Sequence, residues 1–168
     1  GAGDDSIAAT GNATIDAQGG NNTVSASGTG PVTTGAGDDL IQVNGNVAVT
    51  SGGGKDTISG ISGNTLNLGD GGQSVDIGLG GHEILGTGDG NDTINVWAGT
   101  VGVGGSPSTT AGASTVDGGA GDDVFQEVSP FHQTAGNLLT GGAGVDTYIL
   151  AAAQDCCDQA FTTAPDTI

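Results

Sequence analysis

A repeat of 17 residues is the feature that most limits how this chain can fold. Written in rows of 17 from Gly1, with a sixth row beginning at Gly88, the sequence keeps three columns in register. The third column is always glycine, the fifth always carries a side-chain oxygen, and the seventh is always Ile or Val. Chance would not hold three columns over so many rows, so the repeat predicts units that stack on one another. The fifth column contains Asp5, Asn22, Asp39, Asp56, Gln73 and Asp92, and the third contains Gly3, Gly20, Gly37, Gly54, Gly71 and Gly90.

Each row contains two short stretches with strand character, such as 40–43 and 48–51, in which apolar and polar residues alternate. Alternation predicts strands with one face buried. A shorter turn separates the two strands, and we group Gly11-Asn12, Gly45-Asn46 and Gly63-Asn64 as examples of it. Strands this short cannot bury a face alone, but stacked neighbours can. The predicted fold class is therefore all-β: a parallel β-roll or β-helix solenoid with about 17 residues per turn.

The register divides the chain into four parts. Residues 1–104 hold the regular repeats, and the polar stretch 105–117 is expected to be a loop. Residues 118–150 return to irregular turns of the same kind, and 151–168 are expected to form a loop or short helix that leads back to a repeat. Both ends fall inside the pattern. We therefore expect a segment of a longer protein, or a unit that continues end to end with adjoining segments or copies of itself.

The charge of the chain restricts its partners. Asp and Glu number 19 against a single Lys, which gives a net charge of −18. Such acidity argues against nucleic acid and anionic membranes as partners. It is typical either of bound cations or of a disordered chain, and the periodic spacing of the acids favours cations. No apolar run approaches the ~20 residues of a membrane helix, so membrane insertion is not expected.

The glycine-rich turns have the layout of a calcium loop. Gly-x-Gly allows a sharp turn, and the Asp that follows offers hard oxygen ligands, of which calcium takes about six to eight. One turn offers too few oxygens, so each ion is expected between two successive rows, shared by their fifth-column carboxylates. The later turns add two members to this column. The better pairs are Asp39 with Asp56, Asp92 with Asp123, and Asp123 with Asp146.

The rows do not all offer the same ligands. Asn22 and Gln73 present neutral oxygens, so weaker or empty sites are expected there. Lys55, the only basic side chain, lies in the fourth column and is a candidate to replace part of a missing cation's charge. The Gly-Asn turns have no carboxylate at the ligand position, so calcium is expected along one edge only. The candidate metal ligands are Asp5, Asn22, Gly35, Gly37, Asp39, Gly52, Gly54, Asp56, Gly88, Gly90, Asp92, Gly119, Gly121, Asp123, Gly142, Gly144 and Asp146.

Two nonapeptides, 118–126 and 141–149, match the pattern GGxGxDxUx throughout, and 87–95 lacks only its first glycine. In these motifs the chain resembles the RTX, or haemolysin-type, calcium-binding repeats. The resemblance covers most of the chain except 102–114 and 151–163. It implies a right-handed parallel β-roll with calcium in the turns, and type I secretion from a Gram-negative bacterium to the cell surface or beyond. The chain departs from the family in its 17-residue turn, where the family has about 18 as two nonapeptides, and in its second edge without Asp.

These observations predict a calcium-binding structural module, folded by calcium, of a secreted or cell-surface RTX protein such as an adhesin, surface-layer or filament component. Stacked Asp residues repel one another without a counter-ion, so metal binding and folding should be coupled. One alternative is an accessory β-roll domain of a type I-secreted lipase, protease or epimerase. Another is an ice- or glycan-binding module, which would use outward Thr and Ser ladders that Leu40, Gln42 and Asp76 interrupt.

Catalytic motifs are not evident in the sequence. Neither His82 nor His132 accompanies a recognisable nucleophile motif, and Gly-x-Ser-x-Gly is absent, so the chain is not expected to be an enzyme. The only cysteines, Cys156 and Cys157, are adjacent and cannot form a disulfide framework. Free thiols and an intermolecular bond remain open for them.

Overall fold

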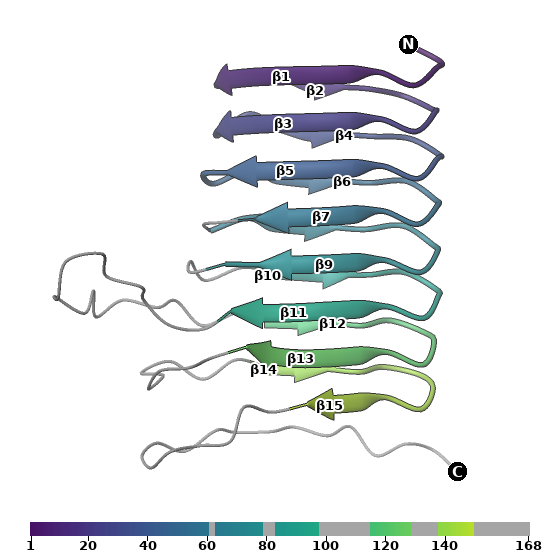
Figure 1. The fold of residues 1–168 in the computed structure, drawn as a ribbon. Helices are drawn as coiled ribbons and strands as arrows, with labels where there is room; N and C mark the ends of the chain where they lie inside the picture. Colours follow the sequence, from purple (N-terminus) through teal and green to yellow (C-terminus); the bar gives the residue numbers. More distant parts are fainter. Residues whose placement is uncertain (61–62, 79–82, 98–114, 129–137, 150–168) are drawn as a thin grey trace, which may run out of the picture.

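Two parallel β-sheets, wound from one continuous coil, make up the fold (Figure 1). The structure is a computed structural model that describes residues 1–60, 63–78, 83–97, 115–128 and 138–149, and these ranges contain strands and turns but no helix. The eight-stranded sheet consists of β1 (Ser6–Gly11), β3 (Thr23–Gly28), β5 (Leu40–Asn44), β7 (Thr57–Gly60), β9 (Ser74–Ile77), β11 (Thr93–Trp97), β13 (Val124–Val128) and β15 (Thr147–Ile149), in that order. The seven-stranded sheet consists of β2 (Ile15–Asp16), β4 (Val32–Thr33), β6 (Ala48–Thr50), β8 (Thr65–Asn67), β10 (Glu83–Gly86), β12 (Thr115–Asp117) and β14 (Leu138–Thr140).

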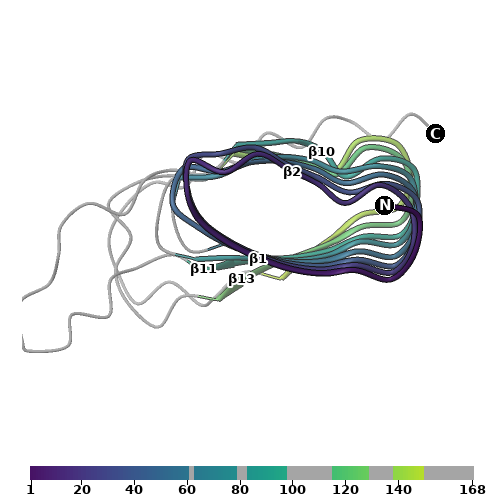
Figure 2. The ribbon, with the colours of Figure 1, turned by 90° about the horizontal axis from the view of Figure 1, so that it is seen from above.

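The strand register confirms the predicted solenoid. Ser6 pairs with Thr23, Thr23 with Leu40, Leu40 with Thr57, and Thr57 with Ser74, so neighbouring strands are offset by 17 residues. The offset then grows to 19, 31 and 23 residues as the sheet continues through Thr93, Val124 and Thr147. Insertions therefore enlarge the later coils without breaking the sheet. Viewed along the stack, the coils superimpose as a flattened loop (Figure 2).

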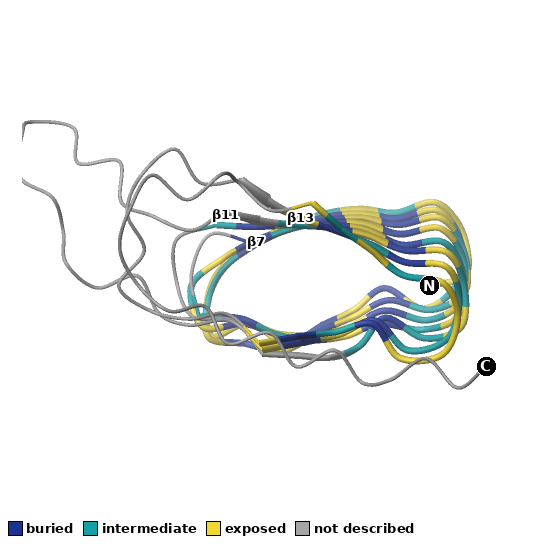
Figure 3. Ribbon diagram, turned by 90° about the horizontal axis from the view of Figure 1, so that it is seen from below, coloured by how far each residue is buried: buried dark blue, intermediate teal, exposed yellow. Residues whose placement is uncertain are grey.

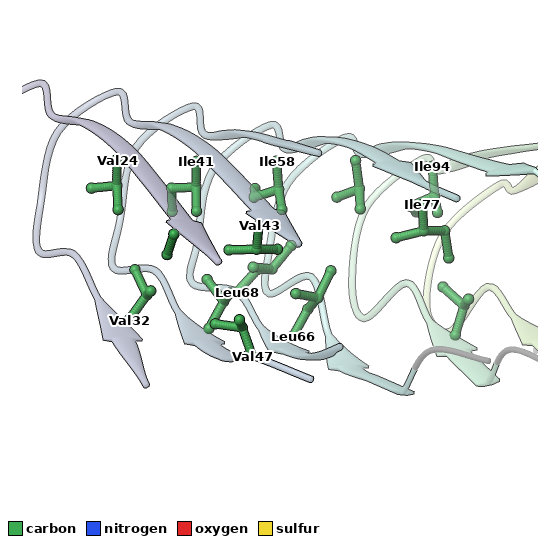
Figure 4. Close-up of a cluster of buried hydrophobic side chains, with 14 of the residues drawn as sticks. Val24, Val32, Ile41, Val43, Val47, Ile58, Leu66, Leu68, Ile77 and Ile94 are labelled. Carbon is green, nitrogen blue, oxygen red and sulfur yellow. The ribbon is translucent and has the colours of Figure 1, made fainter. Parts of the chain in front are cut away.

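The core is a thin layer of mainly aliphatic side chains between the two sheets, to which Phe125 also belongs. The seventh-column residues Ile41 and Ile58 of the eight-stranded sheet are fully buried, and Val32 and Leu66 of the other sheet are buried too (Figure 4). Buried residues alternate with exposed ones along strands such as β5 and β9, so one face of the sheet is inside and one outside (Figure 3). Each fully buried Ile or Leu contributes roughly 1.5–3 kcal/mol, and the stacked coils provide the partner surface that one coil lacks.

The outward face of the eight-stranded sheet bears on the ice- and glycan-binding alternative. Leu40 lies between Thr23 and Thr57 in the register, and its side chain is 39% exposed. Gln42 separates Ser25 from Ser59 in the same way. The hydroxyl ladders are therefore interrupted on this face, as the sequence indicated.

Two expectations about the turns need correction. Asn64 is in register with Val47, not with Asn46, because Ala48 pairs with Thr65. Its side chain is buried, and its Oδ1 accepts a hydrogen bond of 3.1 Å from the amide of Val47. The expected loop 105–117 also ends earlier, because Thr115–Asp117 form β12 and place Val116 in the core.

Several sequence predictions concern residues outside the described ranges. These are the rest of the 105–117 loop, the short helix within 151–168, the two cysteines, His82 and His132. Among the described residues, no helix is long and apolar enough to cross a membrane.

Candidate metal site

The two edges of the solenoid differ in how strictly their length is kept. At one edge, which we call the glycine edge, the seven links from the seven-stranded to the eight-stranded sheet are all six residues long: 17–22, 34–39, 51–56, 68–73, 87–92, 118–123 and 141–146. The turns at this edge stack in register in Figure 1, on the side where the N-terminus lies. The links in the other direction vary from three residues between β1 and β2 to 17 between β11 and β12. Insertions are thus confined to the other links, which indicates a constraint on the glycine edge.

Third-column glycines are one part of that constraint. Gly37 and Gly54 have φ of +138° and +135°, a left-handed conformation that costs little only for glycine. A Cβ at Gly37 would collide with the carbonyl oxygen of Gly20, and one at Gly54 with that of Gly37. The amide of Gly37 donates a hydrogen bond of 2.9 Å to the carbonyl of Gly53 in the next coil. Conformation and close stacking therefore both require glycine here.

The fifth-column side chains are the second part of the constraint on the glycine edge. They point into the coil and connect each turn to the previous one. The amide of Asp39 donates to Oδ1 of Asp56 at 3.0 Å, and the amide of Asp92 donates to Oδ1 of Asp123 at 2.9 Å. The same bond recurs in every coil, from Asp5 to Asn22, Asn22 to Asp39, Asp56 to Gln73, Gln73 to Asp92 and Asp123 to Asp146. We call this series the inner ladder. It brings together each pair of carboxylates that the sequence predicted to be neighbours.

The second oxygen of each buried carboxylate is not satisfied. Asp39, Asp56, Asp92 and Asp123 are 2%, 1%, 1% and 0% exposed, and the Oδ2 atom of each has no hydrogen-bond partner in the structure. An isolated buried carboxylate is unfavourable by several kcal/mol unless a cation, a donor or a proton compensates it. The structure therefore has four buried carboxylate oxygens, along one column, that a nearby cation would stabilise.

Burial shifts the pKa values of three of these groups. The pKa of Asp123 rises to about 6, chiefly because burial disfavours the charged form and also because Asp92 and Asp146 repel it. Burial likewise raises the pKa of Asp56, with a smaller rise from the charge of Asp39. The pKa of Asp92 is raised by burial as well. Hydroxyl groups of Ser51 and Thr87 approach Asp56 and Asp92 and lower their pKa values by part of this rise.

The sequence predicted that Asn22 and Gln73 offer neutral oxygens as weak ligands, and the structure shows another use of these side chains. Their carbonyl oxygens are used in the inner ladder, where they accept the amides of Asp5 and Asp56. Their NH₂ groups instead donate to turn carbonyls, including Gly20 O at 2.8 Å from Asn22 and Gly69 O at 2.9 Å from Gln73. The carbonyl oxygens of the turn are therefore within reach of the fifth-column side chain.

A second ladder, which the sequence reasoning missed, runs along the exposed side of the same turns. Fourth-column side chains accept amides from the following coil, so Asp4 accepts from Asn21 at 2.7 Å and Asp38 accepts from Lys55 at 2.9 Å. Asn21, Asn91 and Asp122 repeat the bond further along. The adjacent pairs of Asp and Asn residues in the turns could have indicated this second ladder from the sequence. The first residue of each pair belongs to the second ladder, and the next one belongs to the inner ladder. Lys55 is exposed and joins this outer ladder through its backbone amide.

The predicted glycine ligands all lie on the glycine edge. Each would, with a Cβ, collide with the carbonyl oxygen of its equivalent in the previous coil, which shows how closely the turn carbonyls stack: Gly35, Gly37, Gly52, Gly54, Gly88, Gly90, Gly119, Gly121, Gly142 and Gly144. Within the described ranges, no three Asp, Glu, His or Cys side chains converge on one point. A cation here would therefore bind one or two carboxylates together with backbone carbonyls.

The end members of the inner ladder are more open. Asp5 is partly exposed, and its Oδ2 lies 3.2 Å from the N-terminal amine. Asp146 is half-buried, and its Oδ2 points toward Gly141. The buried carboxylates between them meet the requirements of a hard-cation site more fully, because water is excluded from them.

Comparisons with known proteins do not place the chain in a family. A scan against protein-family models found no match, and searches of curated proteins and of solved structures found none either. The geometry of the glycine edge is therefore the main indication of function.

Proposed function

We propose that this chain is a calcium-binding structural module whose ions stack along the glycine edge. The observation that carries the proposal is the row of four buried Oδ2 atoms, on Asp39, Asp56, Asp92 and Asp123, without hydrogen-bond partners. Turn carbonyls lie within reach of this column, as the amide contacts of Asn22 and Gln73 indicate. Carboxylate and carbonyl oxygens are the ligands of hard cations, and a flexible set of this kind suits calcium better than the strict octahedron of magnesium.

Electrostatics support a role for the ions in folding. The chain has a net charge of −18, and the inner ladder stacks Asp on Asp between neighbouring coils. Without cations, folding must bury these carboxylates next to one another or protonate them. Bound calcium would remove that cost, so its binding free energy would add directly to the stability of the fold.

The setting that fits such a module is outside the cell or at its surface, where calcium is abundant. Extracellular calcium modules bind with dissociation constants of roughly 10⁻⁴–10⁻³ M. Together with the resemblance to RTX repeats, this supports a stacked spacer or scaffold in a secreted or surface protein. The described residues form a repetitive stack of parallel coils, which suits such a spacer.

Circular dichroism of the chelated and calcium-loaded protein tests the proposal. We expect a weaker β-sheet signal and a lower melting temperature in EDTA than at millimolar calcium, with a heat of binding in calorimetry. Magnesium at the same concentration is the control, and it should restore much less of the signal. An unchanged β-sheet signal in EDTA together with no heat on calcium addition would refute the proposal.

A further inference from the structure

Coils along the glycine edge are of two chemical kinds, and two positions distinguish them. Where the fifth column holds Asp, the residue five positions earlier is a hydroxyl residue or glycine: Thr34, Ser51, Thr87, Gly118 and Gly141 precede Asp39, Asp56, Asp92, Asp123 and Asp146. Where the fifth column holds an amide, the earlier residue is apolar: Ala17 precedes Asn22, and Leu68 precedes Gln73. The two positions are neighbours in space, since Asp123 Oδ2 would contact a Cβ at Gly118. An apolar side chain at the earlier position thus occurs only together with an amide in the fifth column.

Asn22 illustrates the amide kind of coil. Its Nδ2 donates to Gly20 O at 2.8 Å, to Asp39 Oδ1 at 3.1 Å and to Gln18 O at 3.4 Å. Its Oδ1 accepts the amide of Asp5. The opposite orientation would place the amide oxygen against carbonyl and carboxylate oxygens, and the NH₂ group against a backbone N–H, so the surroundings fix the orientation.

Gln73 reaches the same arrangement with a longer side chain. Its Nε2 donates to Gly69 O at 2.9 Å and to Gly54 O at 3.1 Å, and its Oε1 accepts the amide of Asp56. At 2% exposed, it is as buried as the carboxylates of the column. Two side chains of different length therefore bring an NH₂ group to the turn carbonyls.

The carboxylate coils have oxygens where the amide coils have donors. Asp39 and Asp56 each leave a buried Oδ2 without a partner, and the buried hydroxyl oxygens of Thr34 and Ser51 are also without partners in the structure. Two of these coils place a hydroxyl group near the carboxylate, Ser51 for Asp56 and Thr87 for Asp92. Ala17 and Leu68 have no polar side-chain group at the corresponding place in the amide coils.

We propose that the side-chain amides of Asn22 and Gln73 replace the bound ion in their coils. The inference rests on the proposed calcium function and specifies where along the stack the ions lie. An NH₂ group satisfies two carbonyls without adding charge, and its hydrogens repel a cation. The ions therefore load in two groups, one around Asp39 and Asp56 and one around Asp92, Asp123 and Asp146, separated by the metal-independent coil of Gln73.

The direct test replaces the amide with a carboxylate. In N22D, the aspartate loses the NH₂ donor and faces Asp39, so we expect about one additional calcium ion per chain in calorimetry and a lower melting temperature in EDTA. The matched control is N21D, which makes the same chemical change one residue away on the exposed outer ladder, where Asp4 and Asp38 already accept the same bond. N21D should leave the calcium stoichiometry unchanged.

The reverse test converts a carboxylate coil into an amide coil. The double variant T34A/D39N copies the Ala17 and Asn22 pair, so it should bind at least one calcium ion fewer and melt several degrees higher than the unchanged protein in EDTA. It keeps the inference testable if N22D fails to fold.

The results of these experiments distinguish a failure of the inference from a failure of the proposed function. If the unchanged protein binds calcium but N22D gains no ion, or T34A/D39N is no more stable in EDTA, the inference is overturned and the proposed function stands. If the unchanged protein binds no calcium, the proposed function fails and the inference fails with it.

Discussion

The backbone amide of Asp39 donates a 3.0 Å hydrogen bond to Oδ1 of Asp56. This type of bond both connects successive turns of the glycine edge and orients the carboxylates of the proposed cation sites. It holds two successive turns at a fixed separation. It also orients the carboxylate of Asp56 so that Oδ2 remains buried and without a partner. Stability and cation binding therefore depend on the same side chains.

Loss of a carboxylate shared between two ion sites should remove more than one ion. In D123A, the two neighbouring sites, shared with Asp92 and Asp146, each lose a ligand, so the calcium stoichiometry measured by calorimetry should fall by more than one. D39A should lose one ion, because the other neighbour of Asp39 is Asn22, whose amide replaces an ion. D76A is the control, because Asp76 is an exposed residue on the outward face of β9. A loss of one ion or none in D123A would mean that ions are not shared between coils.

The metal-free protein should become less stable as the pH rises. Asp123 has a folded-state pKa of about 6, above the ordinary value of 3.8, so folding favours its protonated form. That stabilisation is fully present below about pH 4 and is lost as the pH rises through 6. Its loss lowers the free energy of unfolding by roughly 2–3 kcal/mol, at 1.36 kcal/mol per pKa unit. The raised pKa values of Asp56 and Asp92 act in the same direction.

Thermal melts in EDTA at pH 4.5 and pH 7.5 measure this effect, and the melting temperature should be higher at pH 4.5. D123N, which cannot ionise, is the control and should show a smaller difference. A melting temperature in EDTA that rises with pH would contradict the assignment of Asp123 as a buried, uncompensated carboxylate.

Adjacent glycines should differ sharply in their tolerance of a methyl group. G54A places a Cβ against the carbonyl of Gly37 at a φ of +135°, and it should cost at least about 2 kcal/mol of unfolding free energy. G53A is the matched control, because a Cβ there meets only Asp70 O at 3.6 Å and the equivalent position already holds Ala36. Urea unfolding in calcium measures both, and equal effects would show that the turn is not held as described.

The two faces of the eight-stranded sheet should also respond differently. I58A removes a fully buried side chain from a thin core, so we expect a loss of about 2–5 kcal/mol in unfolding free energy. L40A shortens a side chain that is 39% exposed and should change that free energy by no more than about 0.5 kcal/mol. Comparable losses in the two variants would place Leu40 in a core, contrary to the structure.

The sequence was sufficient for most of the fold. Glycine in the third column and Ile or Val in the seventh, as in Gly37 and Ile41, indicated the 17-residue coil, the sharp turn and the inward face of the strand. These features repeat because every coil meets the same steric conditions, so a periodic pattern in the chain reports them directly. The pairing of Asp39 with Asp56 followed from the period alone, since residues one period apart lie side by side in a solenoid.

The tertiary structure alone decided what those side chains do. The direction of the inner ladder, the unpaired Oδ2 of Asp56, and the donation from Asn22 and Gln73 to turn carbonyls all depend on atoms in the adjacent coil. The register of Asn64 with Val47 likewise appears only when the two strands are paired. A sequence pattern gives the position of a residue along the chain, but the orientation of its polar atoms is fixed by hydrogen-bond partners that stacking brings within reach.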